Sequence, residues 1–323
     1  MLPMISRRFV LGGGLAAASV VRAPSAWAAA GDFASFLATF RASARAAGIS
    51  GATLDRALAG LAPDPRVVAL DRHQPEFTLS WAQYRASRVS PARISQGRDA
   101  RARSAVLLRD VATAYGVDPA VVVGIWGLES NYGTYQGDFS TVSALATLAW
   151  EGRRAALFKS ELIAALRILD AGKLPQARLT GSYAGAMGQP QFMPSAYLRY
   201  GVDFNGDGSC DIWTDAADVL ASIGNYLAGH GWQRGLGWGA AVAPPPDFDA
   251  AHAGARSLAE WRALGLSPRR PLGPPEAEAR LVLPGGASGE AFLVSENFAV
   301  IRRYNASDFY ALAVGLLGDE VVA

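Results

Sequence analysis

The chain has 323 residues, of which 50% are hydrophobic and 18% charged, and its formal net charge is +2. This near-neutral balance gives no support for nucleic-acid binding, and the single cysteine, Cys210, excludes an internal disulfide. The length suits one large domain or a core with a smaller insertion, and eight tryptophans can help to build a packed interior.

Residues 1–28 are predicted to be an export signal and not part of the fold. The pair Arg7 and Arg8 precedes an apolar run rich in Gly and Ala, and Ala26-Trp27-Ala28 resembles a cleavage site, which together indicate a twin-arginine signal peptide. The run is too short for a permanent membrane span and no lipidation cysteine lies at the cleavage site, so no permanent membrane anchor is expected. A buried N-terminal helix is the alternative. Cleavage would leave about 295 residues with a formal charge of about −1, in the periplasm.

Two helical regions are expected next. Between Asp32 and Leu61 apolar residues recur at helical spacing, and Pro63 and Pro65 interrupt the pattern. The stretch Trp81–Arg109 is also expected to be helical and contains Tyr84. It carries seven arginines: Arg85, Arg88, Arg93, Arg98, Arg101, Arg103 and Arg109. Such a basic face is either solvated or turned toward an acidic polymer.

The stretch DPAVVVGIWGLESNYG, residues 118–133, is predicted to be a buried helix with one carboxylate at its end. Asp118 can cap the helix and Pro119 fits its first position, and the residues that follow leave almost no polar face. Gly133 is expected to stop the helix after Glu129. Apolar burial and the negative end of the helix dipole both raise the pKa of an acid here, and a carboxyl that is protonated near neutral pH suits a general acid. The alternative is an ordinary Glu that is satisfied by Arg or by water.

A segment of small residues, 181–195, follows two further predicted helices over 140–150 and 153–171. Its sequence, GSYAGAMGQPQFMPS, places small positions close together before two glutamines, a phenylalanine and two prolines. Such a segment lets the backbone approach a ligand while amides and an aromatic ring make directed contacts. An ordinary connection between helices is the alternative.

Residues 203–211, DFNGDGSCD, resemble the first part of an EF-hand loop. Oxygen-bearing side chains stand at positions 1, 3, 5 and 9 and a glycine at position 6, so alternate oxygens can converge on Ca²⁺. Position 12 is Thr214 and not the usual bidentate Glu, although Asp215 or Asp218 could reach in from the following helix. The sequence leaves open whether this loop is a metal site or only an Asp/Gly-rich turn.

The C-terminal third is expected to change architecture after a proline run at 244–246. The predicted elements are a helix over Asp218–Leu227, a short helix over Ser257–Leu264, strands over Arg280–Leu283 and Ala291–Val294, a candidate third strand over Phe298–Ile301, and a last helix over Ser307–Leu317.

Four of these stretches occur in the order typical of the lytic murein transglycosylase B family, which the chain resembles over nearly all of its length after the signal. They are GIWGLESNYGTYQG, GSYAGAMGQPQFMPSAY, DFNGDGSCDIW with NYLAGHGW, and RYNASDFYALAV. The resemblance implies a mainly α (α+β) fold with a lysozyme-like helical core, extra N-terminal helices and a small β insertion. We place the helical catalytic region at 29–240, the insertion at 241–300 and a C-terminal helix that returns to the core at 301–323.

The resemblance also implies which residues bind and cleave the substrate. Glu129 matches the single catalytic acid/base of the family. The residues that match the glycan groove are Tyr84, Ser182, Gln191, Phe192, Tyr226, Tyr304, Asn305 and Tyr310.

The loop that begins at Asp203 matches the family's calcium site, for which a structural role is expected. The matched ligands are Asp203, Asn205, Asp207, the Ser209 carbonyl and Asp218, although one extra residue near Thr214 leaves the choice between Asp215 and Asp218 open. No cofactor is expected for catalysis.

The partner that the resemblance implies is the glycan strand of peptidoglycan, on which a monomer would act. Ordinary glycosidases use two carboxylates, whereas one is embedded in these motifs. The expected reaction therefore cleaves the bond between N-acetylmuramic acid and N-acetylglucosamine, with closure of the C6 hydroxyl into a 1,6-anhydro ring. Two alternatives stay open: a hydrolytic muramidase on the same scaffold, and a non-catalytic protein that binds the cell wall.

Overall fold

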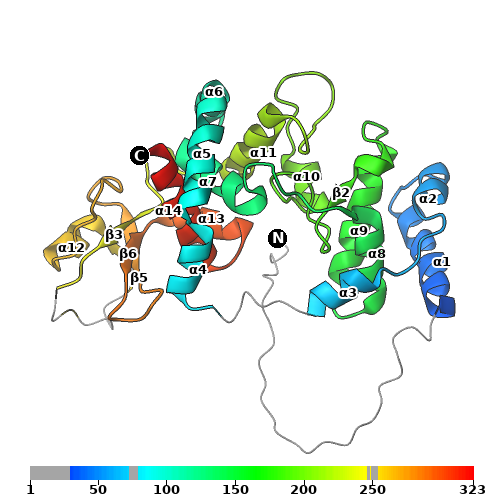
Figure 1. The fold of residues 1–323 in the computed structure, drawn as a ribbon, viewed down its shortest axis with the longest axis horizontal. Coiled ribbons are helices and arrows are strands. Elements are labelled where there is room, and N and C mark those ends of the chain that lie inside the picture. The colour runs from blue at the N-terminus through cyan, green and yellow to red at the C-terminus, as the bar shows by residue number, and fades with distance from the viewer. Residues whose placement is uncertain (1–29, 73–78, 246–247, 249–253) are drawn as a thin grey trace, which may run out of the picture. The chain divides into compact units, whose positions relative to one another are not determined.

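The computed structural model describes residues 30–72, 79–245, 248 and 254–323. Packing divides the chain into two compact units, whose elements are labelled in Figure 1. The first unit comprises residues 30–72, 137–187 and 192–198, and the second comprises the described residues of 79–136, 188–191 and 199–323. The predicted signal peptide, residues 1–28, lies outside the described residues.

The first unit is built mainly from helices. Its elements are α1 (Ala30–Ala46), α2 (Gly51–Ala57), α3 (Pro65–Arg72), β1 (Phe139–Ser140), α8 (Thr141–Glu151), α9 (Ala155–Asp170), the 3-10 helix η2 (Gln176–Arg178), β2 (Thr180–Gly181) and the start of α10 (Pro194–Tyr200). Helices α8 and α9 lie side by side (Figure 1), and their residues Leu145, Leu162 and Leu166 are fully buried. The helices predicted for 140–150 and 153–171 are thus confirmed as α8 and α9.

A buried carboxylate joins α3 to the connection between α8 and α9. Asp71 is only 3% exposed and forms ion pairs with both Arg153 and Arg154. A buried charge is costly when it loses its partner, so the two arginines hold α3 in place within the first unit.

The second unit holds eight further helices among the described residues and a four-stranded sheet. The helices are α4 (Trp81–Arg88), α5 (Pro91–Arg103), α6 (Ala105–Tyr115), α7 (Pro119–Ser130), α11 (Ala216–Gly229), α12 (Leu258–Ala263), α13 (Glu296–Tyr304) and α14 (Asp308–Val322). The helical region predicted for Trp81–Arg109 contains three helices. The first break lies at Ser90, whose hydroxyl accepts a hydrogen bond from the Arg93 N–H, and Pro91 then begins α5.

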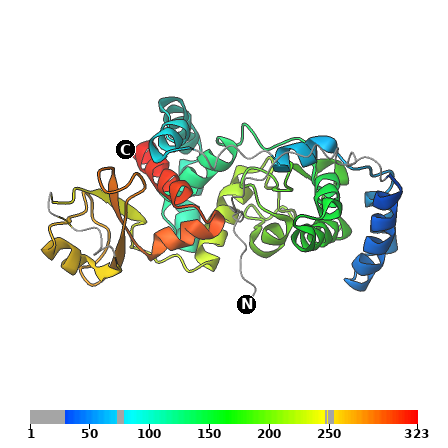
Figure 2. The same cartoon turned by 90° about the horizontal axis from the view of Figure 1, so that it is seen from below.

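Helix α14, red in Figure 2, packs along α7. Glycines lie at the contact. A Cβ atom added at Gly124 would lie 2.2 Å from the carbonyl oxygen of Val314, and one at Gly318 would lie 2.2 Å from the carbonyl oxygen of Ala120. Both distances are far below van der Waals contact. The absence of side chains at the two glycines therefore lets the backbones of α7 and α14 approach closely and sets their relative register.

The antiparallel sheet of the second unit has the strand order β3-β6-β5-β4. Its strands are β3 (Gly239–Val242), β4 (Arg256–Ser257), β5 (Glu278–Val282) and β6 (Ala291–Val294). Leu293 pairs with Ala240 on one side and with Leu281 on the other. Leu281 and Leu293 join the fully buried Trp261 of α12 in one apolar core, so the sheet and α12 stabilise each other.

The strands predicted for 280–283 and 291–294 are confirmed as β5 and β6. The candidate third strand, Phe298–Ile301, is wrong because these residues lie in α13. The hydroxyl of Ser295 accepts a hydrogen bond from the Asn297 N–H and caps this helix. A short apolar run fits a buried strand and a buried helix face equally well, which explains the error.

The described residues are mainly helical, which confirms the predicted mainly α class. Within them, every helix taken singly is too short or too polar to cross a membrane. Only α6 and α7 taken together meet the length and composition criteria, and these two helices are bent by 116° at their break.

Candidate active site

Helix α7 carries the candidate acid, and its local sequence explains where it begins. The Asp118 carboxylate accepts a hydrogen bond of 2.9 Å from the Ala120 N–H, and Pro119 occupies the first helical position. Residues 120–127 are all buried, so α7 lies in the interior of the second unit. Glu129 stands in the last turn and is half-buried.

The chain leaves α7 through three consecutive residues with left-handed backbone, Asn131 (φ 49°), Tyr132 (φ 59°) and Gly133 (φ 86°). The helix ends at Ser130, before the predicted stop at Gly133, because Asn131 already adopts the left-handed conformation. The Ser130 hydroxyl accepts a hydrogen bond of 3.0 Å from the Gly133 N–H, and the Tyr132 ring packs edge-on against Trp126. These contacts hold a strained turn directly after the acid.

Tyr310 of α14 binds the carboxylate of Glu129 directly. Its hydroxyl donates a hydrogen bond of 2.5 Å to Oε1 of Glu129. Tyr310 is 4% exposed, and burial, followed by the nearby charge of Glu129, raises the pKa of its hydroxyl well above 10. The phenol therefore keeps its proton and remains a donor to Glu129 at neutral pH.

Tyr226 and Tyr304, both predicted for the site, form a ring pair with centroids 4.7 Å apart. The Tyr226 hydroxyl donates to the Arg303 carbonyl (2.8 Å), and the Tyr304 hydroxyl donates to the Pro190 carbonyl (2.6 Å). Burial, followed by the charge of Glu129, raises the pKa of Tyr304 well above its usual value. Tyr226 is buried whereas Tyr304 is half-buried, so Tyr304 is the better placed of the two to meet a sugar ring.

Tyr84 and Asn305 extend this group of residues in the second unit. The Tyr84 ring in α4 lies 5.8 Å from that of Phe309, the neighbour of Tyr310, and the Arg88 guanidinium lies over it. Asn305 ends α13 directly after Tyr304 and is half-buried.

Gln191 is the predicted glutamine of the small-residue segment, and it belongs to the second unit. Its backbone is left-handed (φ 51°), and its Nε2 atom donates to the carbonyls of Gln136 (3.0 Å) and Gly188 (2.9 Å). The side chain therefore braces the loop that precedes it.

Ser182 and Phe192, also predicted for the glycan groove, belong to the first unit. The Ser182 hydroxyl accepts a hydrogen bond of 3.1 Å from the Ala186 N–H and closes a tight turn at Gly185 (φ 85°). The Phe192 side chain is only 2% exposed, so its ring packs in the interior. Its predicted place in the glycan groove stays a prediction.

The loop that begins at Asp203 is folded around its own carboxylates. Asp203 accepts hydrogen bonds from the N–H groups of Gly206 (2.8 Å), Asp207 (3.1 Å) and Gly208 (2.7 Å). The Asn205 amide nitrogen lies 2.8 Å from a carboxylate oxygen of Asp215 and 3.4 Å from one of Asp207. Side-chain oxygens thus gather at the predicted calcium loop.

Asp218 is fully buried and ties the two ends of this loop together. Its carboxylate accepts from the N–H groups of Phe204 (2.8 Å) and Asp211 (2.7 Å), and burial raises its pKa. Of the two candidate acids, Asp215 is the one that accepts a hydrogen bond from the Asn205 amide. Within the described ranges no group of three or more Asp, Glu, His or Cys side chains lies at metal-binding spacing.

Gln189 and His230 are close to the site but were not assigned a role from the sequence. Gln189 bridges the Trp126 indole and the Trp213 carbonyl. The His230 ring lies 4.1 Å from that of Tyr226, and burial lowers its pKa. Gln189 lies two residues before Gln191 in the same segment. Its position among small residues is the sequence feature that could have pointed to a role for it.

Two arginines of the predicted basic face brace helix ends. Arg93 donates to the carbonyls of Ser87 and Arg88 at the end of α4, and Arg98 donates to the carbonyl of Glu320 in α14. Arginines at these positions satisfy carbonyl groups that a helix end leaves unpaired. Arg98 is exposed, as the solvated alternative predicts, whereas Arg93 is half-buried.

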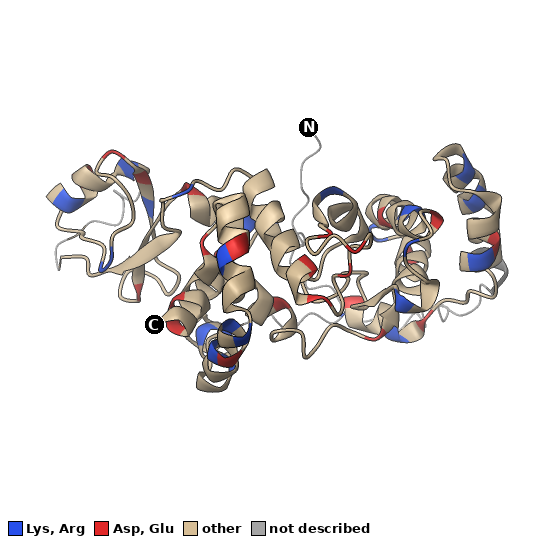
Figure 3. Ribbon diagram, turned by 90° about the horizontal axis from the view of Figure 1, so that it is seen from above, with Lys and Arg blue, Asp and Glu red and all other residues tan. Residues whose placement is uncertain are grey.

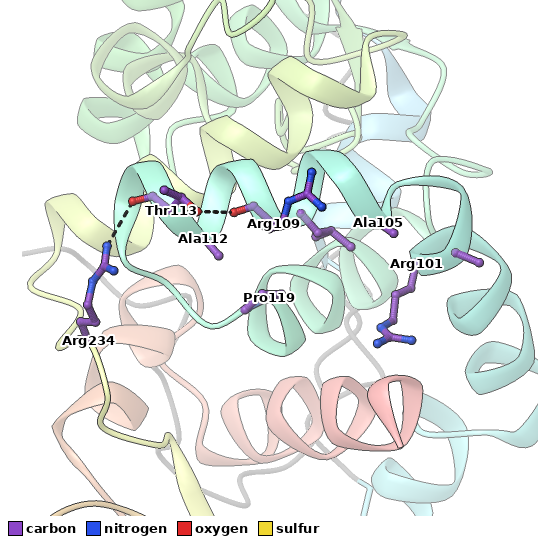
Figure 4. Close-up of a pocket in the computed structure, with 9 residues that line it drawn as sticks. Arg101, Ala105, Arg109, Ala112, Thr113, Pro119 and Arg234 are labelled. Atoms are coloured by element: carbon purple, nitrogen blue, oxygen red, sulfur yellow. Dashed lines mark hydrogen bonds between the residues drawn. The ribbon is translucent and has the colours of Figure 1, made fainter.

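A pocket of about 470 Å³ lies beside Pro119 (Figure 4). It is lined by Arg101 and Arg109 of the predicted basic face and by Arg234. Arg234 donates to the Thr113 carbonyl at 3.1 Å. The pocket lies at the opposite end of α7 from Glu129, and its lining includes none of the residues predicted for the site. Figure 3 shows that charged residues of both signs occur on the helices of this unit.

Comparisons with known proteins identify the family and the class of enzyme. Residues 32–319 match the family described as the transglycosylase SLT domain. Membrane-bound lytic murein transglycosylase B of Escherichia coli (strain K12) is 36% identical over 248 residues, which cover 75% of this chain and 67% of that protein. SltB3 from Pseudomonas aeruginosa, solved in complex with NAG-anhNAM-pentapeptide, is 45% identical with a TM-score of 0.85, covering 90% of this chain and 80% of that one. The Escherichia coli lytic transglycosylase Slt35, solved in complex with calcium, is 32% identical with a TM-score of 0.75, covering 90% of this chain and 92% of that one.

The fold is helical, and a tyrosine binds the one glutamate at the end of a buried helix. Together with the similarity to SltB3 and to lytic murein transglycosylase B, this arrangement defines an enzyme of the lytic transglycosylase class. The chain belongs to the transglycosylase SLT domain family. The family membership predicted from the four sequence motifs is thereby confirmed.

Proposed function

We propose that this protein cleaves the β-1,4 bond between N-acetylmuramic acid and N-acetylglucosamine in peptidoglycan and leaves a 1,6-anhydro end. The observation that carries the proposal is the hydrogen bond from Tyr310 to Oε1 of Glu129 at the end of buried α7. The relative SltB3 was solved with a fragment that contains anhNAM, which supports the same product here.

Glu129 acts first as a general acid. Because Tyr310 donates to Oε1, the proton of the neutral carboxyl is carried on Oε2, which delivers it to the bridging oxygen of the glycosidic bond. The neighbouring N-acetyl carbonyl of the substrate stabilises the positive charge that develops at C1 as the bond breaks.

Glu129 then acts as a general base. The ionised carboxylate takes the proton from the C6 hydroxyl of the same sugar, and the C6 oxygen bonds to C1 to close the anhydro ring. The substrate supplies the nucleophile, so a second protein carboxylate and a water molecule are not needed. The Tyr310 hydroxyl stabilises the carboxylate between the two proton transfers.

The remaining residues position the glycan. We assign Tyr304 to stacking on a sugar face, because it is half-buried beside Glu129, and Tyr84 and Asn305 to the wall of the same groove. Gln191 is assigned to the N-acetyl and lactyl groups. Tyr226 is buried, and we assign it to packing beneath the groove. For Ser182 and Phe192, which belong to the first unit, the role in glycan binding that the family motifs imply stays a prediction.

The test is mass spectrometry of the soluble products after the protein acts on purified peptidoglycan. Muropeptides one water lighter than hydrolysis products are expected, and Glu129→Gln should abolish their release while leaving the melting temperature nearly unchanged. Products with ordinary reducing ends would instead identify a muramidase. Binding to the wall with no soluble product, or full activity of Glu129→Gln, would contradict the proposal.

We further propose a structural calcium ion in the loop at 203–218. The support is a donor set of hard oxygen atoms, the amide of Asn205 placed between the carboxylates of Asp207 and Asp215, and the calcium complex of the relative Slt35. Asp203, Asn205, Asp207 and the Ser209 carbonyl would hold the ion together with Asp215. Asp218, the ligand that the family motif implied, is fully buried and holds the two ends of the loop together. The ion would neutralise the acids of the loop and contribute stability.

The site of action follows from the substrate. We propose that the protein is exported by the leader at 1–28 and works in the periplasm as a monomer. The support is the twin-arginine pattern of the sequence and the murein named in its relatives. Fractionation of cells that express the full chain, with Arg7→Lys and Arg8→Lys as the control variant, tests the export route.

A further inference from the structure

The Gln189 side chain lies buried, 8% exposed, between α7 and the loop at 203–218. Its Oε1 atom accepts a hydrogen bond of 2.7 Å from the Trp126 indole, and its Nε2 atom donates one of 2.9 Å to the Trp213 carbonyl. We infer that Gln189 is a positioning residue for the cleavage reaction, because its amide couples this loop to α7 and so fixes the position of Glu129. The inference rests on the proposed function only through the role of Glu129.

The link on the side of α7 is short. Trp126 precedes Glu129 by three residues, so the two side chains are neighbours on one face of the helix. The Trp126 indole is almost fully buried and also contacts the Tyr132 ring of the strained turn. A shift of this indole would therefore move the last turn of α7, which carries Glu129, and the strained turn that follows it.

The link on the side of the loop is a continuous series of hydrogen bonds. The Trp213 carbonyl accepts from Gln136 (3.0 Å) as well as from Gln189. The Trp213 N–H donates to the Asp211 carboxylate (2.9 Å), and the Asp211 N–H donates to the buried Asp218 carboxylate (2.7 Å). The acids that shape the loop thus connect, bond by bond, to the amide of Gln189.

The two partners require a group between them that both accepts and donates, and the neutral amide of Gln189 does so at every pH. An indole N–H only donates and a backbone carbonyl only accepts, so the bridging group must do both at one end of a side chain. Space is limited as well, because a Cβ atom added at Gly133 (φ 86°) would lie 2.5 Å from Oε1 of Gln189. The orientation of the Gln189 amide is therefore determined by its surroundings.

The test measures kcat and KM on a soluble peptidoglycan oligosaccharide for Gln189→Leu, Trp126→Phe and the double variant. Each single variant should lose about tenfold in kcat with KM changed less than about twofold, because a misplaced acid slows the chemical step more than binding. The double variant should be no slower than either single variant, since both remove the same hydrogen bond. Unchanged kcat in Gln189→Leu, or losses that multiply in the double variant, would overturn the inference.

A second variant, Gln189→Glu, separates positioning from simple loss of stability. A protonated carboxyl can accept from the indole and donate to the carbonyl as the amide does, whereas the ionised form cannot donate. The ratio of its kcat to that of the wild type should therefore rise as the pH falls, and a ratio that is flat with pH would contradict the proposal. Gln136→Leu is the comparison variant: it removes the other donor to Trp213 (3.0 Å) and a longer hydrogen bond to the Gly133 carbonyl (3.3 Å) but leaves the bond between Gln189 and Trp126 intact, so its kcat should fall less than that of Gln189→Leu.

These ratios keep the inference separate from the proposed function. The type of reaction is determined by the mass of the products, whereas the effect of Gln189 is measured as a ratio of rates for whichever product forms. If the protein proves to be a muramidase but its variants show the predicted kcat ratios, the role of Gln189 stands. If it proves to be a transglycosylase whose variants lack these ratios, the role of Gln189 is refuted.

Discussion

The hydroxyl of Tyr310 and Oε1 of Glu129 are 2.5 Å apart, although the two residues are 181 positions apart in the sequence. Tyr310 lies in the first turn of α14 and Glu129 in the last turn of α7, and these two helices pack closely at glycines. Burial keeps the Tyr310 hydroxyl protonated, so it offers a donor to Glu129 in both the acid and the base step of the proposed reaction.

Replacement of Tyr310 by Phe should lower kcat by about ten- to a hundredfold, because the carboxylate of Glu129 loses its hydrogen-bond donor. The same loss disfavours the ionised form of Glu129, so the acid stays protonated to higher pH and the alkaline limb of the pH–rate profile should move to higher pH. The measurement is the rate of anhydro-product release across pH. A limb that moves to lower pH would contradict the assigned role.

A matched control for this variant is Tyr132→Phe. Tyr132 is also a buried tyrosine near Glu129, and within the described part of the chain its hydroxyl has no hydrogen-bond partner. Removal of a buried, unsatisfied hydroxyl should leave activity unchanged and leave stability equal or up to about 1 kcal/mol higher. A loss of activity comparable to that of Tyr310→Phe would show that any buried tyrosine here is needed.

Gly124→Ala should destabilise the protein strongly, because its Cβ atom would lie 2.2 Å from the Val314 carbonyl oxygen. Overpacking of this kind costs about 1–3 kcal/mol or more, and separation of α7 from α14 would also weaken the contact between Tyr310 and Glu129. Denaturant unfolding and product release measure the two effects. Gly51→Ala in α2, where a Cβ atom meets open space, is the control and should change stability by less than about 1 kcal/mol.

Asp319 should make stability depend on pH. Burial raises its pKa from 3.8 to about 6, while Arg270 at 3.0 Å offsets part of this shift. Between these two values the folded state binds more protons than the unfolded state, so the free energy of unfolding falls as the pH rises, by about 3 kcal/mol in total. Above about pH 6 this contribution levels off.

Asp319→Asn should remove this dependence, since the amide does not titrate. Urea unfolding at pH 4 and pH 7 is expected to show a smaller decrease for the variant than for the wild type. Arg270 retains its hydrogen bond to the Gly239 carbonyl, so the variant should still fold. An equal decrease in the free energy of unfolding of both proteins would show that folding does not raise the pKa of Asp319.

Chelation should lower the melting temperature by several degrees if the loop at 203–218 holds calcium, because a ligand that binds only the folded state stabilises it by mass action. Added Ca²⁺ should restore the original value. The variant Asp203→Ala with Asp207→Ala serves as the control and should melt at one temperature with and without chelator. A wild-type melting temperature that chelator leaves unchanged would contradict a structural calcium ion.

Features that depend on local chemistry were accessible from the sequence. The cap at Asp118 and Pro119, the burial of α7, and the strands β5 and β6 all follow from residue types within a few positions of each other. The family motifs also pointed to Tyr310 as a groove residue, but not to its hydrogen bond with Glu129.

Features that the residue types leave undecided were not accessible from the sequence. The run at Phe298–Ile301 is apolar in a way that suits a strand or a helix, and the Ser295 cap decides for α13. Helix α7 ends before the predicted stop at Gly133, because Asn131 takes the left-handed conformation. The packing of Tyr132 against Trp126 supports this conformation. The burial of Phe192, a residue predicted for the glycan groove, is likewise visible only in the folded structure.

Helix α14 is synthesised after every other described element that surrounds Glu129, yet it provides both Tyr310 and the surface on which α7 lies. A growing chain that has reached only residue 307 therefore has its acid but neither the donor to that acid nor the backbone that holds its helix. Catalytic activity should thus appear in one step, when α14 docks. A protease that cuts between α13 and α14 would reverse that step without touching the acid itself.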